Sequence, residues 1–178
     1  MDDRSLWFMA EAFASRLRTL SALLDKGAAF AERQGLPFEA LSQASLAPDM
    51  FPLSQQVSVA CRMAWQAMSL LSGGETPPIQ PIGDALDDLK GRIAETLGRI
   101  EGVDEAAFAG AAARPIVLNL GEVREAEFVG AEFLRDWSLP NFYFHLTTAY
   151  DILRYKGVEL GKGDFMQHAA HRIRQRAG

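Results

Sequence analysis

The chain has 178 residues, of which 48% are hydrophobic and 23% charged, with a formal net charge of −5 and one cysteine. A domain of this length can bury roughly 70% of the surface that its unfolded chain exposes, so we expect one domain that folds without disulfides or structural zinc. This composition excludes a disordered chain, and the lone Cys61 excludes every metal site that needs several cysteines.

The charge is unevenly distributed along the chain. Residues 166–178 contain three arginines (Arg172, Arg174 and Arg176) and no acid, so the residues before them carry a net charge of −8. The negative charge of residues 1–165 disfavours nucleic acid as the main partner. The start of the chain is charged, and no apolar run reaches the about 20 residues of a membrane span, so we predict a cytoplasmic protein without membrane insertion. Residues 167–178 are interpreted as a flexible basic tail.

Four segments show the three- and four-residue spacing of apolar side chains that indicates amphipathic helices. They cover about residues 5–33, 52–72, 85–100 and 131–156. Asp84 is expected to cap the third of these helices at its N-terminus. Pro140 interrupts the fourth segment, either as a kink in one long helix or in the first turn of a new helix after Trp137, and the sequence leaves both alternatives open.

Helical spacing disappears over residues 114–129, where two β-rich runs flank Gly121 and Glu122. This pattern predicts a short β-hairpin that leans on the helices. The proline-rich stretch 76–81 is expected to carry the chain across an end of the helices. The predicted fold is mainly all-α, an antiparallel up-down four-helix bundle with one short β-hairpin before the last helix.

Known nucleotide-binding and serine-hydrolase motifs are absent from the sequence, which leaves one helix face as a candidate site. Asn141 and His145 are four residues apart and Thr148 is nearly one turn further on, so all three lie on one side of the last helix. Such a row can hold a ligand or a metal, and a hydrogen-bonded structural role for His145 is the alternative. Cys61 lies on the apolar stripe of the second helix, which favours an inert buried thiol.

Several segments resemble one known family over the chain to about Met166. These segments are Leu46-Ala-Pro-Asp-Met-Phe-Pro-Leu53, Leu139-Pro-Asn-Phe-Tyr-Phe-His145, Thr147-Thr-Ala-Tyr-Asp-Ile-Leu-Arg154 and Gly157-Val-Glu-Leu-Gly-Lys-Gly-Asp-Phe165. They look like an uncharacterised bacterial branch of the DinB-like superfamily, a domain of unknown function spanning residues 1–166. The resemblance implies a four-helix bundle in which a helix-2 histidine and a His-x-x-x-His pair on helix 4 bind a divalent metal. It also implies dimers and, in some members, thiol-dependent transferases or isomerases.

The chain departs from this metal-binding pattern. In the last predicted helix, the second histidine of the family's pair corresponds to His145 and the first corresponds to Asn141. The second predicted helix, at about residues 52–72, contains no histidine and offers only Gln55, Gln56 and Cys61 as substitutes. A carboxamide oxygen is a weaker and harder donor than an imidazole, so the site is degenerate for zinc or nickel. We therefore expect no cofactor, with a divalent metal at His145 as the weaker alternative.

The leading hypothesis is a non-catalytic or small-ligand-binding protein on a DinB-like bundle. The alternative is a thiol-dependent transferase or isomerase that uses His145, with metal assistance. A homodimer is expected, because the resemblance implies one and because the aromatic residues exceed what one bundle interior holds. The aromatic residues in question are Trp7, Phe8, Trp65 and Trp137.

Overall fold

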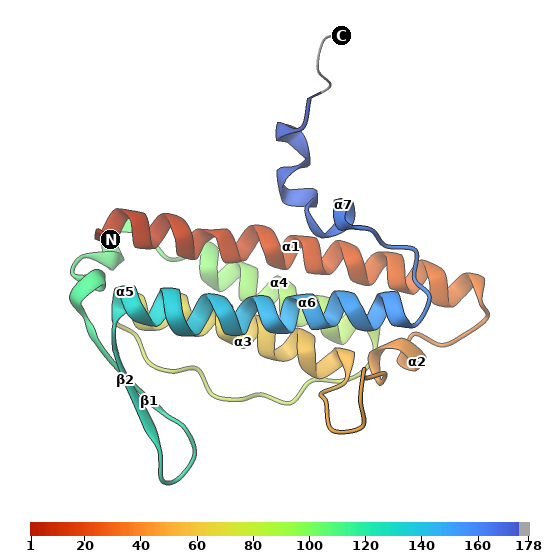
Figure 1. The fold of residues 1–178 in the computed structure, drawn as a ribbon, viewed down its shortest axis with the longest axis horizontal. Coiled ribbons are helices and arrows are strands. Elements are labelled where there is room, and N and C mark those ends of the chain that lie inside the picture. The colour runs from red at the N-terminus through yellow and green to blue at the C-terminus, as the bar shows by residue number, and fades with distance from the viewer. Residues whose placement is uncertain (175–178) are drawn as a thin grey trace.

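The computed structural model describes residues 1–174 and is mainly helical, as the sequence predicts. Long helical segments lie side by side along the molecule (Figure 1). They are α1 (Asp3–Arg33), α3 (Leu53–Leu71), α4 (Leu86–Glu101), and a continuous run from α5 (Gly130–Glu132) through the π-helical segment Phe133–Ser138 into α6 (Leu139–Tyr155). The connections hold the short helices α2 (Glu39–Ser42), η1 (Glu105–Phe108) and η2 (Ala111–Ala113).

The apolar stripes of these helices face a common core. On α1, Leu6, Leu17, Leu20 and Leu24 are fully buried, and the ring of Phe13 meets that of Phe142 on α6 edge-on, with centroids 4.8 Å apart. The prediction that Asp84 caps the N-terminus of α4 is wrong. Ala85 occupies the cap position and its N–H is satisfied by the carboxylate of Asp88 at 3.3 Å, whereas Asp84 accepts a hydrogen bond from Gln43.

Contacts between the helices give their directions. Ion pairs join Arg18 to Glu101 and Lys90 to Asp25, so α1 and α4 are antiparallel. Phe13 of α1 meets Phe142 near the start of α6, and Gly27 lies against Leu153 near its end, so these two helices run the same way.

The helices α3 and α4 also share one direction. Thr96 lies beside Cys61, and Arg99 lies beside Trp65, so residue numbers rise together along the two helices. The two helices can share a direction because connector 72–85 runs back along the length of α3 before α4 begins (Figure 1). An extended chain of this length can span about 40 Å, more than the helix beside it. The predicted up-down alternation is therefore wrong between α3 and α4. The prediction that the proline-rich stretch 76–81 crosses an end of the helices is also wrong, because this stretch runs along α3.

Pro140 lies in one long helix rather than at the start of a separate one. The π-helical segment ends directly before α6, whose first turn contains Pro140. A proline has no N–H to donate and its ring crowds the carbonyl four residues earlier, so a locally widened turn accommodates it without breaking the helix.

The predicted hairpin is confirmed as β1 (Pro115–Asn119) paired antiparallel with β2 (Glu125–Val129). Alternate side chains of β1 are buried, and Phe128 of β2 packs against Phe133 and Trp137 with centroids about 6 Å apart. Where the hairpin meets the long helix, a Cβ on Gly130 would lie 1.9 Å from the carbonyl oxygen of Ala111. Only glycine permits this approach of two backbone segments.

The C-terminal residues continue past α6 into α7 (Lys162–Phe165) and η4 (Gln167–Arg172), which lie against α1 and then project away from the helices (Figure 1). Arg172 and Arg174 are exposed. Arg176, the third basic residue of the predicted tail, lies outside the described residues, and the flexibility of the tail stays a prediction.

Candidate functional site

The structure brings together two of the predicted site residues, His145 of α6 and Gln56 of α3. The Nδ1 atom of His145 lies 2.7 Å from Oε1 of Gln56, whose side chain is 1% exposed. The amide nitrogen of Gln56 donates in turn to the carbonyl oxygen of Phe51, at 3.0 Å. Since the amide nitrogen is the donor to Phe51, Oε1 accepts, and the histidine proton therefore resides on Nδ1.

His145 is half-buried, and burial lowers the pKa of its imidazole below the usual value of 6.5. The ring is therefore neutral at pH 7. The exposed ring of Phe144 lies edge-on to it, with centroids 5.2 Å apart. A neutral, hydrogen-bonded imidazole of this kind is what a structural role requires.

The other two residues of the predicted row do not reach His145. Asn141 donates to the carbonyl oxygen of Trp137 at 2.8 Å, and Thr148 donates to that of Phe144 at 2.7 Å. Both side chains thus satisfy backbone carbonyls one turn earlier in their own helical run. Asn141 thus satisfies a carbonyl within the π-helical segment, where regular hydrogen bonding is interrupted.

Metal-ligating side chains do not gather at this face. Residues 1–174 contain no group of three or more His, Cys, Asp or Glu side chains arranged to hold an ion. The face instead offers one imidazole and the amide of Gln56, and that amide is already shared between His145 and a backbone carbonyl. These donors do not fit a tight zinc or nickel site, which ordinarily has three or four good ligands.

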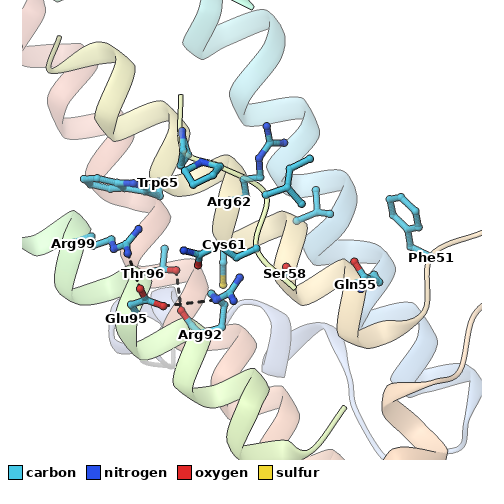
Figure 2. Close-up of a pocket in the computed structure, with 15 residues that line it drawn as sticks. Phe51, Gln55, Ser58, Cys61, Arg62, Trp65, Arg92, Glu95, Thr96 and Arg99 are labelled. Atoms are coloured by element: carbon cyan, nitrogen blue, oxygen red, sulfur yellow. Dashed lines mark hydrogen bonds and ion pairs between the residues drawn. The ribbon is translucent and has the colours of Figure 1, made fainter. Parts of the chain in front are cut away.

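Gln55 and Cys61 lie elsewhere, in a pocket between α3, α4 and connector 72–85. The pocket has a volume of about 320 Å³, and Figure 2 shows its α3 and α4 side chains facing one another. Trp65 and Arg62 line it from α3, and Pro77 to Gln80 line it from the connector.

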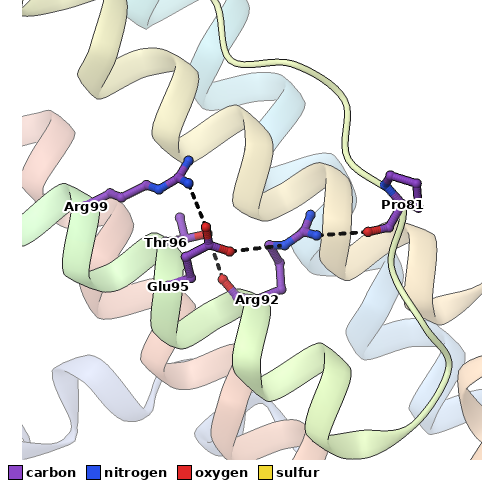
Figure 3. Close-up of polar contacts among 5 residues, drawn as sticks. All are labelled: Pro81, Arg92, Glu95, Thr96 and Arg99. Carbon is purple, nitrogen blue, oxygen red and sulfur yellow. Dashed lines mark hydrogen bonds and ion pairs between the residues drawn. The ribbon is translucent and has the colours of Figure 1, made fainter.

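Charged side chains of α4 order one wall of this pocket (Figure 3). Glu95 accepts from Arg99 at 2.6 Å and lies 3.7 Å from Nε of Arg92. Arg92 also donates to the carbonyl oxygen of Pro81 at 2.9 Å, which holds the connector against the helices. The guanidinium of Arg99 lies over the ring of Trp65, 5.8 Å from its centroid. The wall is thus tied both to α3 and to the connector.

The thiol of Cys61 forms part of the pocket floor. It is 1% exposed, and burial raises its pKa to about 12. The thiolate is the nucleophilic form of cysteine, so at neutral pH this thiol is unreactive. The predicted inert role fits this environment.

Residues 8–166 match the family described as domain of unknown function DUF1993. The chain belongs to DUF1993. It is also similar to a solved structure described as a DinB family member protein from Shewanella denitrificans, with 36% identity and a TM-score of 0.85. The match covers 92% of this chain and 93% of that one, and it confirms the DinB-like resemblance. No curated protein matches the chain.

In this DUF1993 chain, the positions that the resemblance assigns to metal ligands are occupied by Asn141 and His145 on α6. Gln56 is the α3 residue that meets His145, whereas Gln55 and Cys61 face the pocket on another side of α3. From the sequence, all three were expected as possible substitutes for the missing histidine of the second helix. The packing of α3 against α6 places Gln56, rather than Gln55 or Cys61, beside His145.

The arginine-lined pocket of this DUF1993 chain was not predicted. Its sequence signal was the spacing of Arg92, Glu95 and Arg99, which places all three on one face of a helix. That spacing is also typical of a solvated surface with ion pairs. Only connector 72–85, by lying over α3 and α4, turns this surface into a pocket.

The histidines near the C-terminus, His168 and His171, lie on η4. They line a second, more open pocket of about 740 Å³ between η4, α1 and the end of α4. Nδ1 of His168 is buried there without a hydrogen-bond partner among the described residues.

No helix among residues 1–174 has the length and apolar character needed to cross a membrane.

Proposed function

We propose that this DUF1993 protein binds a small molecule in the pocket between α3, α4 and connector 72–85, on a DinB-like scaffold whose metal site is degenerate. The pocket itself carries the proposal. Its volume of about 320 Å³ falls within the range of small-molecule sites, and it combines an aromatic wall at Trp65 with guanidinium groups from two helices. In this proposal the four long helical segments form the four-helix bundle of the superfamily.

The test is ligand-observed NMR with a library of charged and neutral fragments. Val59→Trp places a large side chain in the pocket wall, and Ala94→Trp adds the same side chain on the exposed surface of α4. We expect fragments that bind the wild type and Ala94→Trp to lose binding in Val59→Trp. Far-ultraviolet circular dichroism shows whether each variant is folded. Fragments that bind all three proteins equally, or no binding fragment at all, would refute the pocket as the site.

The degenerate metal site is a separate part of the proposal. It is supported by the hydrogen bond between His145 and Gln56, which occupies one ring nitrogen of His145 and the amide oxygen of Gln56. Elemental analysis of untagged protein carrying His168→Ala and His171→Ala should find well under one zinc, nickel or iron atom per chain. A stoichiometric metal that is lost on adding His145→Ala would overturn this proposal.

A thiol-dependent transferase or isomerase is the second candidate. One observation favours it: His145 is neutral because its pKa is lowered, and its Nε2 atom has no hydrogen bond among the described residues, so it can accept a proton. Purified protein is assayed for conjugation of a low-molecular-weight thiol to electrophiles. An activity that His145→Ala abolishes, while circular dichroism is unchanged, would establish this function in place of the first.

We also propose a cytoplasmic homodimer. The unpaired thiol of Cys61 is typical of a reducing compartment, and the rings of Phe8 and Phe144 are 71% and 57% exposed, which is typical of an interface. Light scattering at tens of micromolar, roughly where a weak interface still closes, should report the mass of two chains. The mass of one chain would refute the dimer.

A further inference from the structure

The pocket between α3, α4 and connector 72–85 concentrates positive charge in an acidic protein. Among residues 1–174, the side chains that line it include three arginines, Arg62, Arg92 and Arg99, and one acid, Glu95. The whole chain carries a formal net charge of −5, so this excess of positive charge is local. Positively charged clefts attract anions, most strongly where the surrounding walls are poorly solvated.

The three arginines differ in how they are paired. Arg92 and Arg99 share the carboxylate of Glu95, and Arg92 also donates to a backbone carbonyl. Arg62 makes no hydrogen bond or ion pair with the described residues, and its Nε atom is buried without a partner. A buried donor without an acceptor is costly, so Arg62 is the group that gains most from a bound acceptor.

Apolar side chains form the rest of the pocket and extend to its rim. Val59 and Trp65 contribute from α3, and the buried Pro77 contributes from the connector. Phe51 and Ile79 stand at the rim with 55% and 79% of their surface exposed. A ligand with an apolar body would cover these side chains, whereas an inorganic ion would leave them in water.

We infer that this pocket binds a small organic carboxylate, with the carboxylate paired to Arg62 and an apolar or aromatic body against Trp65 and the connector. The inference rests on the proposed function and names the class of its ligand. One guanidinium without a partner matches one negative charge, and its planar fork fits a carboxylate. A phosphate dianion would need Arg92 or Arg99 as well, and both are engaged by Glu95.

The experiment measures binding of three carboxylates, 2-naphthoate, benzoate and octanoate, and of their neutral amides, by calorimetry and by tryptophan fluorescence. Inorganic phosphate is the control for charge without an apolar body. The variants are Arg62→Gln, which removes the unpaired charge, and Arg154→Gln, which removes an exposed arginine of α6 outside the pocket. Far-ultraviolet circular dichroism establishes that each variant is folded.

We expect at least one carboxylate to bind about tenfold or more tightly than its amide, and to lose about tenfold or more of its affinity in Arg62→Gln but not in Arg154→Gln. Phosphate should bind more weakly than that carboxylate. If the amides bind as well as the carboxylates, the pocket takes neutral ligands, which refutes this inference and leaves the proposed function intact.

Two further outcomes also refute the inference. Phosphate binding as tight as that of every carboxylate would show an ion site without a role for the apolar walls. Failure of all three carboxylates to bind below roughly 1 mM would show that Arg62 recruits no carboxylate. In that second case, fragments that lose binding in Val59→Trp would still support the pocket as a ligand site.

Discussion

Replacing Gln56 by methionine tests whether the Gln56–His145 pair holds α3 to α6. Methionine has nearly the length of glutamine and a similar helix propensity, so Gln56→Met leaves shape and helix largely unchanged. It removes the acceptor for His145 at 2.7 Å and the donor to Phe51 at 3.0 Å. The loss therefore isolates the polar interactions of a side chain that is 1% exposed.

The expected cost follows from these two hydrogen bonds. Each contributes about 0.5–1.5 kcal/mol net, so their loss lowers the free energy of unfolding by about 1–3 kcal/mol. The apolar methionine gains some transfer free energy in a buried site, which offsets part of this cost. We therefore expect a decrease of about 1–2 kcal/mol.

The assay is urea unfolding followed by circular dichroism and tryptophan fluorescence. Gln55→Met is the matched control, because Gln55 is the exposed neighbour on the same helix and should change stability by less than about 0.5 kcal/mol. The double variant with His145→Ala should lose less than the sum of the single losses, because both single changes remove the same bond. Equal stabilities of Gln56→Met and Gln55→Met, or strict additivity with His145→Ala, would refute the structural role of the pair.

Three other predictions concern His145, the core and the thiol. Because burial lowers the pKa of folded His145, the unfolded chain takes up the proton first as the pH falls below about 6.5, so stability decreases. Urea unfolding at pH 7.5 and 5.5 should show a smaller pH dependence in His145→Ala than in the wild type, and an unchanged dependence contradicts this. Leu20→Ala and Leu89→Ala, at fully buried sites, should each cost about 2–5 kcal/mol, whereas Leu46→Ala, at a site 38% exposed, should cost much less. A cost below about 0.5 kcal/mol at the buried sites would show that they are not packed. Cys61, with its pKa raised to about 12, should resist a thiol reagent in native protein and react rapidly in urea; rapid native labelling would show that the thiol is accessible.

The sequence predicted the elements well because their signals are local. Three- and four-residue apolar spacing places α1 and α3 within a few residues of their bounds, and the loss of that spacing locates the hairpin at β1 and β2. The direction of α4 has no local signal. An apolar stripe requires burial but specifies neither the neighbour nor the direction, because the hydrophobic effect is non-directional. The path of connector 72–85 therefore had to come from the folded chain.

The same distinction applies to the candidate sites. The sequence by itself determined that His145 lacks histidine partners on both helices, because residue identity and helical spacing suffice to establish that. Only the tertiary structure decided that Gln56, 89 residues away, satisfies this imidazole, and that its neighbour Gln55 faces the pocket between α3, α4 and connector 72–85. Only the tertiary structure left Nε of Arg62 buried without a partner among residues 1–174, because burial and pairing depend on which surfaces meet when the helices pack.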